Sequence, residues 1–376
     1  MSWLFTALQV LPQADPLPLP ASPWIFLFLL HLTFSLHLIA MNLTIGGSLL
    51  LTASSFRRSE NLEKLSGFLS KFLPFSLSFT ITLGVAPLLF IQVLYGQLFF
   101  TTSILMGWWW LMILLFLMIA YYSLYLYQHK RDKWPIVRTW APLISVVLMV
   151  IIALLFVMNF KLLCRFAEWK EIYTSGASGW FLNFGHPLVF PTWIHHLLAA
   201  VAIGGILLIL HGWGRRSRDL SYADWAARTG GIMFVVPTFI QFAAGYWMLK
   251  VLPHQLLKAY MFGSVFETAI LFIGMATGTL AALLIAWVAW KRRYGWPVLI
   301  SLVLIAATTA LMVIKRAMVR EALLADLKGF DISAMPVAPQ WDTIAIFAVL
   351  LVGGLAVVGW MLYVLFRGKK DVDEAA

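Results

Sequence analysis

The chain has 376 residues, of which 62% are hydrophobic and only 11% are charged. Soluble domains carry about 25% charged residues, so this composition excludes a water-soluble globular protein. The net charge of +11 does not indicate nucleic-acid binding. The basic residues cluster in short segments between apolar runs, which is the pattern that orients membrane helices.

Nine apolar runs are each long enough to cross a bilayer as a helix. We therefore predict an all-α integral membrane protein with nine transmembrane helices. Its organisation would be a stub over 1–23, which lacks the basic start of a cleavable signal peptide, a helical domain over 24–367 and a tail over 368–376. The expected spans are 24–53, 73–98, 104–127, 139–160, 190–213, 229–250, 264–290, 296–315 and 342–366.

Lysine and arginine are concentrated in every second loop, beginning with Arg57 and Arg58 after the first span. The first 23 residues and the segment 99–103 contain neither residue. Because basic loops stay on the cytoplasmic side, this alternation predicts an N-terminus outside and a cytoplasmic C-terminus. The expected location is the bacterial inner membrane, crossed several times and in contact with lipid.

Two histidines share one predicted depth. His37 and His195 each precede the first basic residue of the following loop by 20 residues, which is about 30 Å of helix. Gln92 and Met275 lie 21 and 16 residues from the basic residues that flank their own spans. Four polar or ligating side chains on four helices would then lie in one layer of the outer half of the membrane.

Ionisable residues inside a membrane usually face the bundle interior and mark a pathway or cofactor. Neutral imidazole and thioether sulfur are both haem-iron ligands, so this layer favours a haem site. The alternative is that each histidine only hydrogen-bonds a neighbouring helix and that the methionine only packs. His31 lies near the outer interface, where it would reach a haem propionate. The chain has one cysteine and no C-x-x-C-H motif, so neither a disulfide nor a covalently attached haem is expected.

Four segments resemble cytochrome bd oxidase subunit I. "HLIAMNLTIGGSLLL" is similar to that family's first-helix haem motif, with His37 nine residues before Gly46. "HPLVFPTWIHHLLAAVAIGG" resembles its fifth-helix motif, with His195 nine residues before Gly204. "GVAPLLFIQVLYG" is similar to its second helix, and "FIGMATGTLAALLI" to the seventh-helix segment that supplies a methionine.

This resemblance implies a cytochrome bd subunit I-like bundle that holds one or two haem b groups. His195 and Met275 would ligate a low-spin haem, and His37 would ligate a second. Lys315, Arg316 and Arg320 lie where the family has the glutamate ligand of a third haem, so that site would be altered. As cations they would pair with haem propionates.

The chain departs from the oxidases at positions that matter for oxygen chemistry. Gln92 replaces the second-helix glutamate, and the predicted span 104–127 contains no acid. The segment 249–263 is too short to form the family's quinol-binding loop. These departures favour a membrane haem-b electron-transfer subunit of a respiratory complex over an oxygen reductase.

Such an oxidoreductase subunit would exchange electrons with a periplasmic cytochrome c or redox enzyme, beside a second membrane subunit. One alternative is a divergent bd-type terminal oxidase that binds O₂ at the haem of His37. The other is a haem-free membrane anchor or transporter, in which the glycines serve only close packing.

Overall fold

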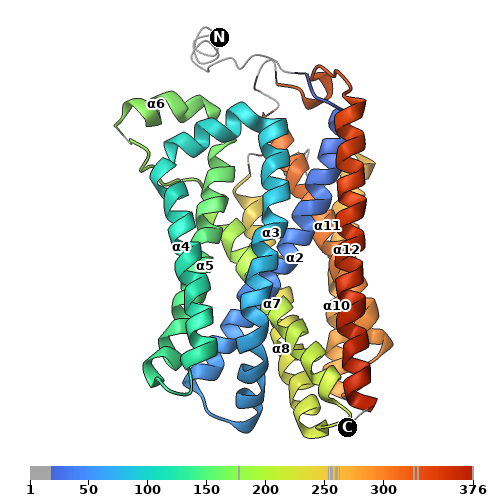
Figure 1. Cartoon of the computed structure of the whole chain (residues 1–376). Coiled ribbons are helices and arrows are strands. Elements are labelled where there is room, and N and C mark those ends of the chain that lie inside the picture. The colour runs from blue at the N-terminus through green and yellow to red at the C-terminus, as the bar shows by residue number, and fades with distance from the viewer. Residues whose placement is uncertain are drawn as a thin grey trace. The chain divides into compact units, whose positions relative to one another are not determined.

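The computed structural model describes residues 18–176, 178–252, 254, 257–258, 261, 263–324, 327 and 330–374 (Figure 1). The described part is helical, apart from loops and one isolated β-bridge. Its long helices are α2 (Pro23–Phe56), α3 (Glu60–Leu105), α4 (Gly107–Lys130), α5 (Pro135–Leu162), α7 (Val189–Arg215), α8 (Leu220–Lys250), α10 (Val265–Lys291), α11 (Trp296–Leu324) and α12 (Trp341–Glu374).

Eight of these helices, α2 to α5, α7, α8, α10 and α11, are long and apolar enough to cross a membrane. The predicted class, an all-α multi-pass membrane protein, is confirmed at this level. The ninth expected span, 342–366, lies within α12. Among the residues whose side chains are described there, the apolar stretch covers only Trp341–Gly354, which is shorter than a span. The described residues therefore contain eight candidate spans rather than nine.

The chain divides into two compact units, one containing 29–330 and the other containing 13–28 and 331–376. In the second unit, the segment before α2 pairs with the segment before α12. The Leu19 amide donates to the Pro336 carbonyl over 2.8 Å, and the Ala338 amide donates to the Leu19 carbonyl over 2.9 Å. Most of the predicted stub lies outside the described residues, since the description begins at residue 18. Helix α12 continues through the start of the predicted tail to Glu374.

Several helices extend beyond their apolar cores. Helix α3 begins at Glu60, although the expected span begins at 73. Ser59 caps this end by accepting a hydrogen bond from the Leu62 amide, and Glu60 and Glu63 lie in the first turn, where negative charge favours a helix. Lys64 and Lys71 are consequently helical residues. At the other end of the bundle, α11 extends to Leu324, so that Lys315 and Arg316 lie on a helix instead of beside its end.

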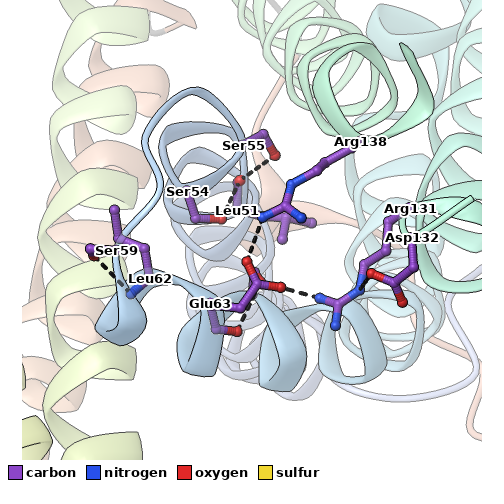
Figure 2. A network of polar contacts seen from close by, with 10 residues as sticks. Leu51, Ser54, Ser55, Ser59, Leu62, Glu63, Arg131, Asp132 and Arg138 are labelled. Carbon is purple, nitrogen blue, oxygen red and sulfur yellow. Dashed lines mark hydrogen bonds and ion pairs between the residues drawn. The ribbon is translucent and has the colours of Figure 1, made fainter. Parts of the chain in front are cut away.

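Ion pairs join the basic loops of the first unit to one another. Arg138 at the start of α5 pairs with Glu63 of α3, as Figure 2 shows, beside Arg131 and Asp132. Lys64 of α3 pairs with Asp219, the N-cap of α8, over 2.5 Å. The loops after α2, α4 and α7 therefore lie at one end of the unit, which we call the basic end.

The loop after α10 also lies at the basic end. Arg292 in this loop pairs with Asp224 of α8 over 3.3 Å. Tyr294 donates a hydrogen bond to the Ala223 carbonyl over 2.5 Å. We call the other end of this unit the opposite end. The loops that are rich in lysine and arginine in the sequence thus lie together in space.

Candidate cofactor site

The two histidines of the predicted layer lie at matching positions on two helices that touch. A Cβ built on Gly46 of α2 would lie 2.8 Å from the Gly204 Cα of α7 and 2.2 Å from the Ala200 carbonyl oxygen. Both helices run toward the basic end, and each histidine precedes its glycine by nine residues. His37 and His195 therefore both lie about 14 Å from this crossing, on the side of the opposite end.

The His37 ring rests against α3. Its Nδ1 donates a hydrogen bond to the Thr80 carbonyl over 3.1 Å, because a carbonyl oxygen can only accept. This bond leaves the proton on Nδ1 and the lone pair on Nε2, which is the arrangement found in metal-ligating histidines. A Cβ at Gly84 would lie 2.8 Å from the His37 Cε1, so the ring position requires a glycine there.

A short chain of hydroxyl groups, on the side of the basic end, holds Thr80 next to the His37 ring. Thr44 of α2 forms hydrogen bonds of 2.7 Å with both Ser76 and Thr80 of α3. All three side chains are buried. Hydroxyl pairs of this kind join membrane helices, and here they hold Thr80 beside the imidazole.

His195 has a buried ring nitrogen without a partner. Its Nδ1 has no geometrically defined hydrogen bond among the described residues, although the imidazole also lies close to the Gln241 backbone. The His195 backbone carbonyl is engaged separately, since Gln241 of α8 donates to it over 3.1 Å. The next residue, His196, places its ring 6.4 Å from the His195 ring at 80°. A buried polar atom that lacks a partner is costly, so an additional partner for this ring would be favourable.

The structure does not place Gln92 beside these histidines. His37 contacts α3 at Thr80 and Gly84, whereas Gln92 follows Gly84 by eight residues, or about 12 Å. The difference from the expected layer arises because α3 begins well before Lys71, so that Lys71 does not mark its inner edge. Met275 of α10 is 38% exposed, and no described contact joins it to His195.

Two of the three basic residues expected at propionates, Lys315 and Arg316, separate in space. Lys315 is buried and donates to the Glu267 carbonyl at the start of α10 over 3.2 Å. Arg316 instead lies between the rings of Phe34 and Phe160, 4.9 and 5.0 Å from their centroids. The Phe34 ring in turn stacks on His37 with 6.4 Å between centroids. Arg316 is thus connected to the His37 site, and Lys315 is directed toward α10.

Two residues near Arg316, Lys161 and His196, were not expected at the site from the sequence, whereas Arg320 was expected to pair with a propionate. Arg320, one helical turn along α11, donates to the Tyr95 hydroxyl over 2.7 Å. Lys161 of α5 and His196 both lie close enough to Arg316 for electrostatic interaction. His31 interacts in the same way with Arg320, and its Nε2 is buried without a partner. The only sequence signal was the presence of basic residues at positions that fall inside helices.

The loop between α5 and α7 lies at the opposite end of the first unit. Arg165 binds both Glu168, through its Nε over 2.9 Å, and Asn183. The hydrogen bond from Arg165 lowers the pKa of the Glu168 carboxyl. Burial, followed by the charges of Lys161 and Arg165, lowers the pKa of His186 from 6.5 to about 4. His186 is therefore neutral at pH 7, and its Nδ1 accepts from the Leu188 amide over 3.1 Å.

Among the described residues, no group of three or more His, Cys, Asp or Glu side chains is arranged to hold a metal ion. A haem differs from such a site because its porphyrin supplies four nitrogens and the protein only one or two axial ligands. The His37 Nε2 fits that requirement, since the bond at Nδ1 leaves its lone pair free, and His195 offers a second imidazole at the matching helix position.

No protein-family model and no curated protein matches this chain. The fold and its composition define a multi-pass all-α membrane protein.

Proposed function

We propose that this chain is a membrane haem-b electron-transfer subunit of the cytochrome bd subunit I type. The observation that carries the proposal is the hydrogen bond from His37 Nδ1 to the Thr80 carbonyl, which leaves Nε2 as the ligating nitrogen. The matched position of His195 supports a second ligand at the same depth.

Haem b would supply a one-electron carrier held inside the bilayer. His37, His195 and Met275 would hold one or two haems through their imidazole nitrogens and thioether sulfur. The ring of His37 is oriented by Thr80 and accommodated by Gly84. Buried hydrophobic residues around the helix crossing, such as Ile45, Leu207 and Ala200, would keep water away.

With the basic end in the cytoplasm, both histidines lie on the periplasmic side of the helix crossing. A haem there is close to the outer surface, where a periplasmic cytochrome c or redox enzyme would exchange electrons with it. A second membrane subunit would receive or supply those electrons. The location that follows is the bacterial inner membrane.

The test begins with the protein purified from membranes of haem-replete cells. Acid extraction and a reduced-minus-oxidised spectrum should show haem b. His37→Ala and His195→Ala should each lose haem, whereas His129→Ala at the basic end should retain the full content. A wild-type protein that folds and carries no haem would overturn the proposal and leave the anchor or transporter reading.

The electron-transfer role has a separate measurement. Stopped-flow mixing of the oxidised protein with a reduced c-type cytochrome should reduce the haem, with a rate that falls as ionic strength rises. If cytochrome c neither reduces nor oxidises the haem at low or high salt, the periplasmic partner is not a cytochrome of this kind.

A further inference from the structure

Three basic side chains gather in the half of the first unit near its opposite end. We call Lys161, Arg316 and Arg320 the cationic cluster. Arg316 lies between Phe34 and Phe160, and Arg320 lies 4.2 Å from the centroid of the Tyr95 ring. Lys161 of α5 interacts electrostatically with both arginines of α11.

The described part of the chain places one carboxylate, that of Glu321, beside the three cations of this cluster, because Glu321 and Arg320 both bond to the Tyr95 hydroxyl. None of its ion pairs includes a member of the cluster. Glu321 is exposed and accepts a 3.3 Å hydrogen bond from the Tyr95 hydroxyl. Burial raises the pKa of the Cys164 thiol despite the nearby cations, so this side chain is uncharged at pH 7.

Two buried nitrogens next to the cluster also lack partners. Arg320 Nε and His31 Nε2 are covered by protein and make no hydrogen bond among the described residues. Uncompensated charge and unpaired donors inside a bilayer are strongly unfavourable. Residues from α2, α5 and α11 thus present an excess of positive charge that an anion from outside the chain would balance.

We propose that the cationic cluster binds an oxyanion, either a carboxylate or a phosphate group. Arginine suits this ligand because its planar guanidinium donates two parallel hydrogen bonds to two oxygens. Arg316 and Arg320 lie one turn apart on α11, so their guanidinium groups can engage one ligand together. Lys161 adds a third charge from α5.

Two sources carry this chemistry. One is the pair of carboxylates of a haem ligated by His37, since Phe34 contacts both His37 and Arg316. The other is the phosphate of a lipid headgroup from the adjacent leaflet. The first source rests on the proposed function, and the second does not.

The first arm of the test titrates haem-depleted protein with haemin and with haemin dimethyl ester, which has no free carboxylates. If the oxyanion belongs to the cofactor, the wild type binds haemin about tenfold to a hundredfold more tightly than the ester. The double variant Arg316→Gln, Arg320→Gln binds both forms alike. Lys170→Gln, an exposed lysine on the short helix α6 (Trp169–Thr174), is the matched control and behaves as the wild type.

The second arm uses native mass spectrometry after delipidation and incubation with vesicles of phosphatidylglycerol or of phosphatidylcholine. A lipid source predicts a retained phosphatidylglycerol that the double variant loses and the control keeps. Circular dichroism and size exclusion check that the variants are folded, and the single variants replace the double variant if it is not. Lys161→Gln should weaken binding in the same arm as the arginine variants.

The outcomes separate this inference from the proposed function. Variants that match the wild type in both arms overturn the oxyanion site, even if haem binds. A wild type that binds no haem while the arginines retain phosphatidylglycerol overturns the proposed function and leaves the oxyanion site in place.

Discussion

Gly46 and Gly204 meet backbone to backbone where α2 crosses α7, with a Cβ on Gly46 only 2.8 Å from the Gly204 Cα. Each glycine follows a histidine of the candidate site by nine residues. The crossing therefore determines the relative depth of His37 and His195. Its close approach is possible only because neither residue has a side chain.

We expect Gly46→Ala to destabilise the protein. The new methyl group would lie 2.2 Å from the Ala200 carbonyl oxygen, and backbone cannot move aside as a flexible side chain can. Overpacking of this kind costs about 1–3 kcal/mol, which a thermal unfolding scan in detergent would register as a lower Tm. Gly214→Ala on α7, where nothing lies within 4 Å, should leave the Tm unchanged or raise it. Equal behaviour of the two variants would contradict the crossing.

Gly84→Ala tests the position of His37 without removing a ligand. The added methyl would lie 2.8 Å from the ring Cε1 and 3.0 Å from Nδ1, so the imidazole must move and its bond to Thr80 must lengthen. We expect a shifted haem absorption band or a reduced haem content. Gly96→Ala on the same helix makes only ordinary contacts of 3.7 Å and longer, and its spectrum should match that of the wild type. An unchanged spectrum in Gly84→Ala would show that no cofactor depends on this ring.

Carbon monoxide distinguishes electron transfer from oxygen reduction. The expected span 104–127, which is α4 in the structure, contains no acid to deliver protons to a haem. We expect the dithionite-reduced spectrum to change little on addition of CO, and the purified protein to consume no O₂ with reduced cytochrome c. Rapid CO binding together with O₂ uptake would support the terminal oxidase instead.

The loop between α5 and α7 should lose stability in acid. The pKa of His186 is about 4 in the folded protein, below its ordinary value of 6.5, so the unfolded state binds the proton more readily. Stability from this group is full above pH 6.5 and falls as the pH decreases toward 4. Protonation would also break the bond that Nδ1 accepts from the Leu188 amide.

Limited proteolysis of the segment 163–188 between pH 7 and pH 4.5 measures this effect. Cleavage of the wild type should accelerate toward low pH, and His186→Gln should have a flatter profile. If the cleavage rates of the wild type and of His186→Gln change equally with pH, another group controls the loop.

Eight of the nine expected spans and the grouping of basic loops were predictable, because hydrophobicity over about 20 residues and the positions of lysine and arginine are local properties. The matching positions of His37 and His195 along their helices were also predictable, since both helices end near their apolar cores. Gln92 was misplaced because Ser59 and Glu60 start α3 well before its first apolar residue. Hydropathy contains no information about helical segments that project beyond the bilayer.

The amino-acid sequence by itself determined that this is an all-α membrane protein with imidazoles inside its apolar helices. Only the tertiary structure decided that Thr80 orients His37, that Lys315 and Arg316 face different neighbours, and that Lys161 joins Arg316 and Arg320. The physical reason is that the insertion of a helix into the membrane depends on its own amino-acid composition. The partner of each polar side chain depends on which residues of other helices lie within about 3 Å of it.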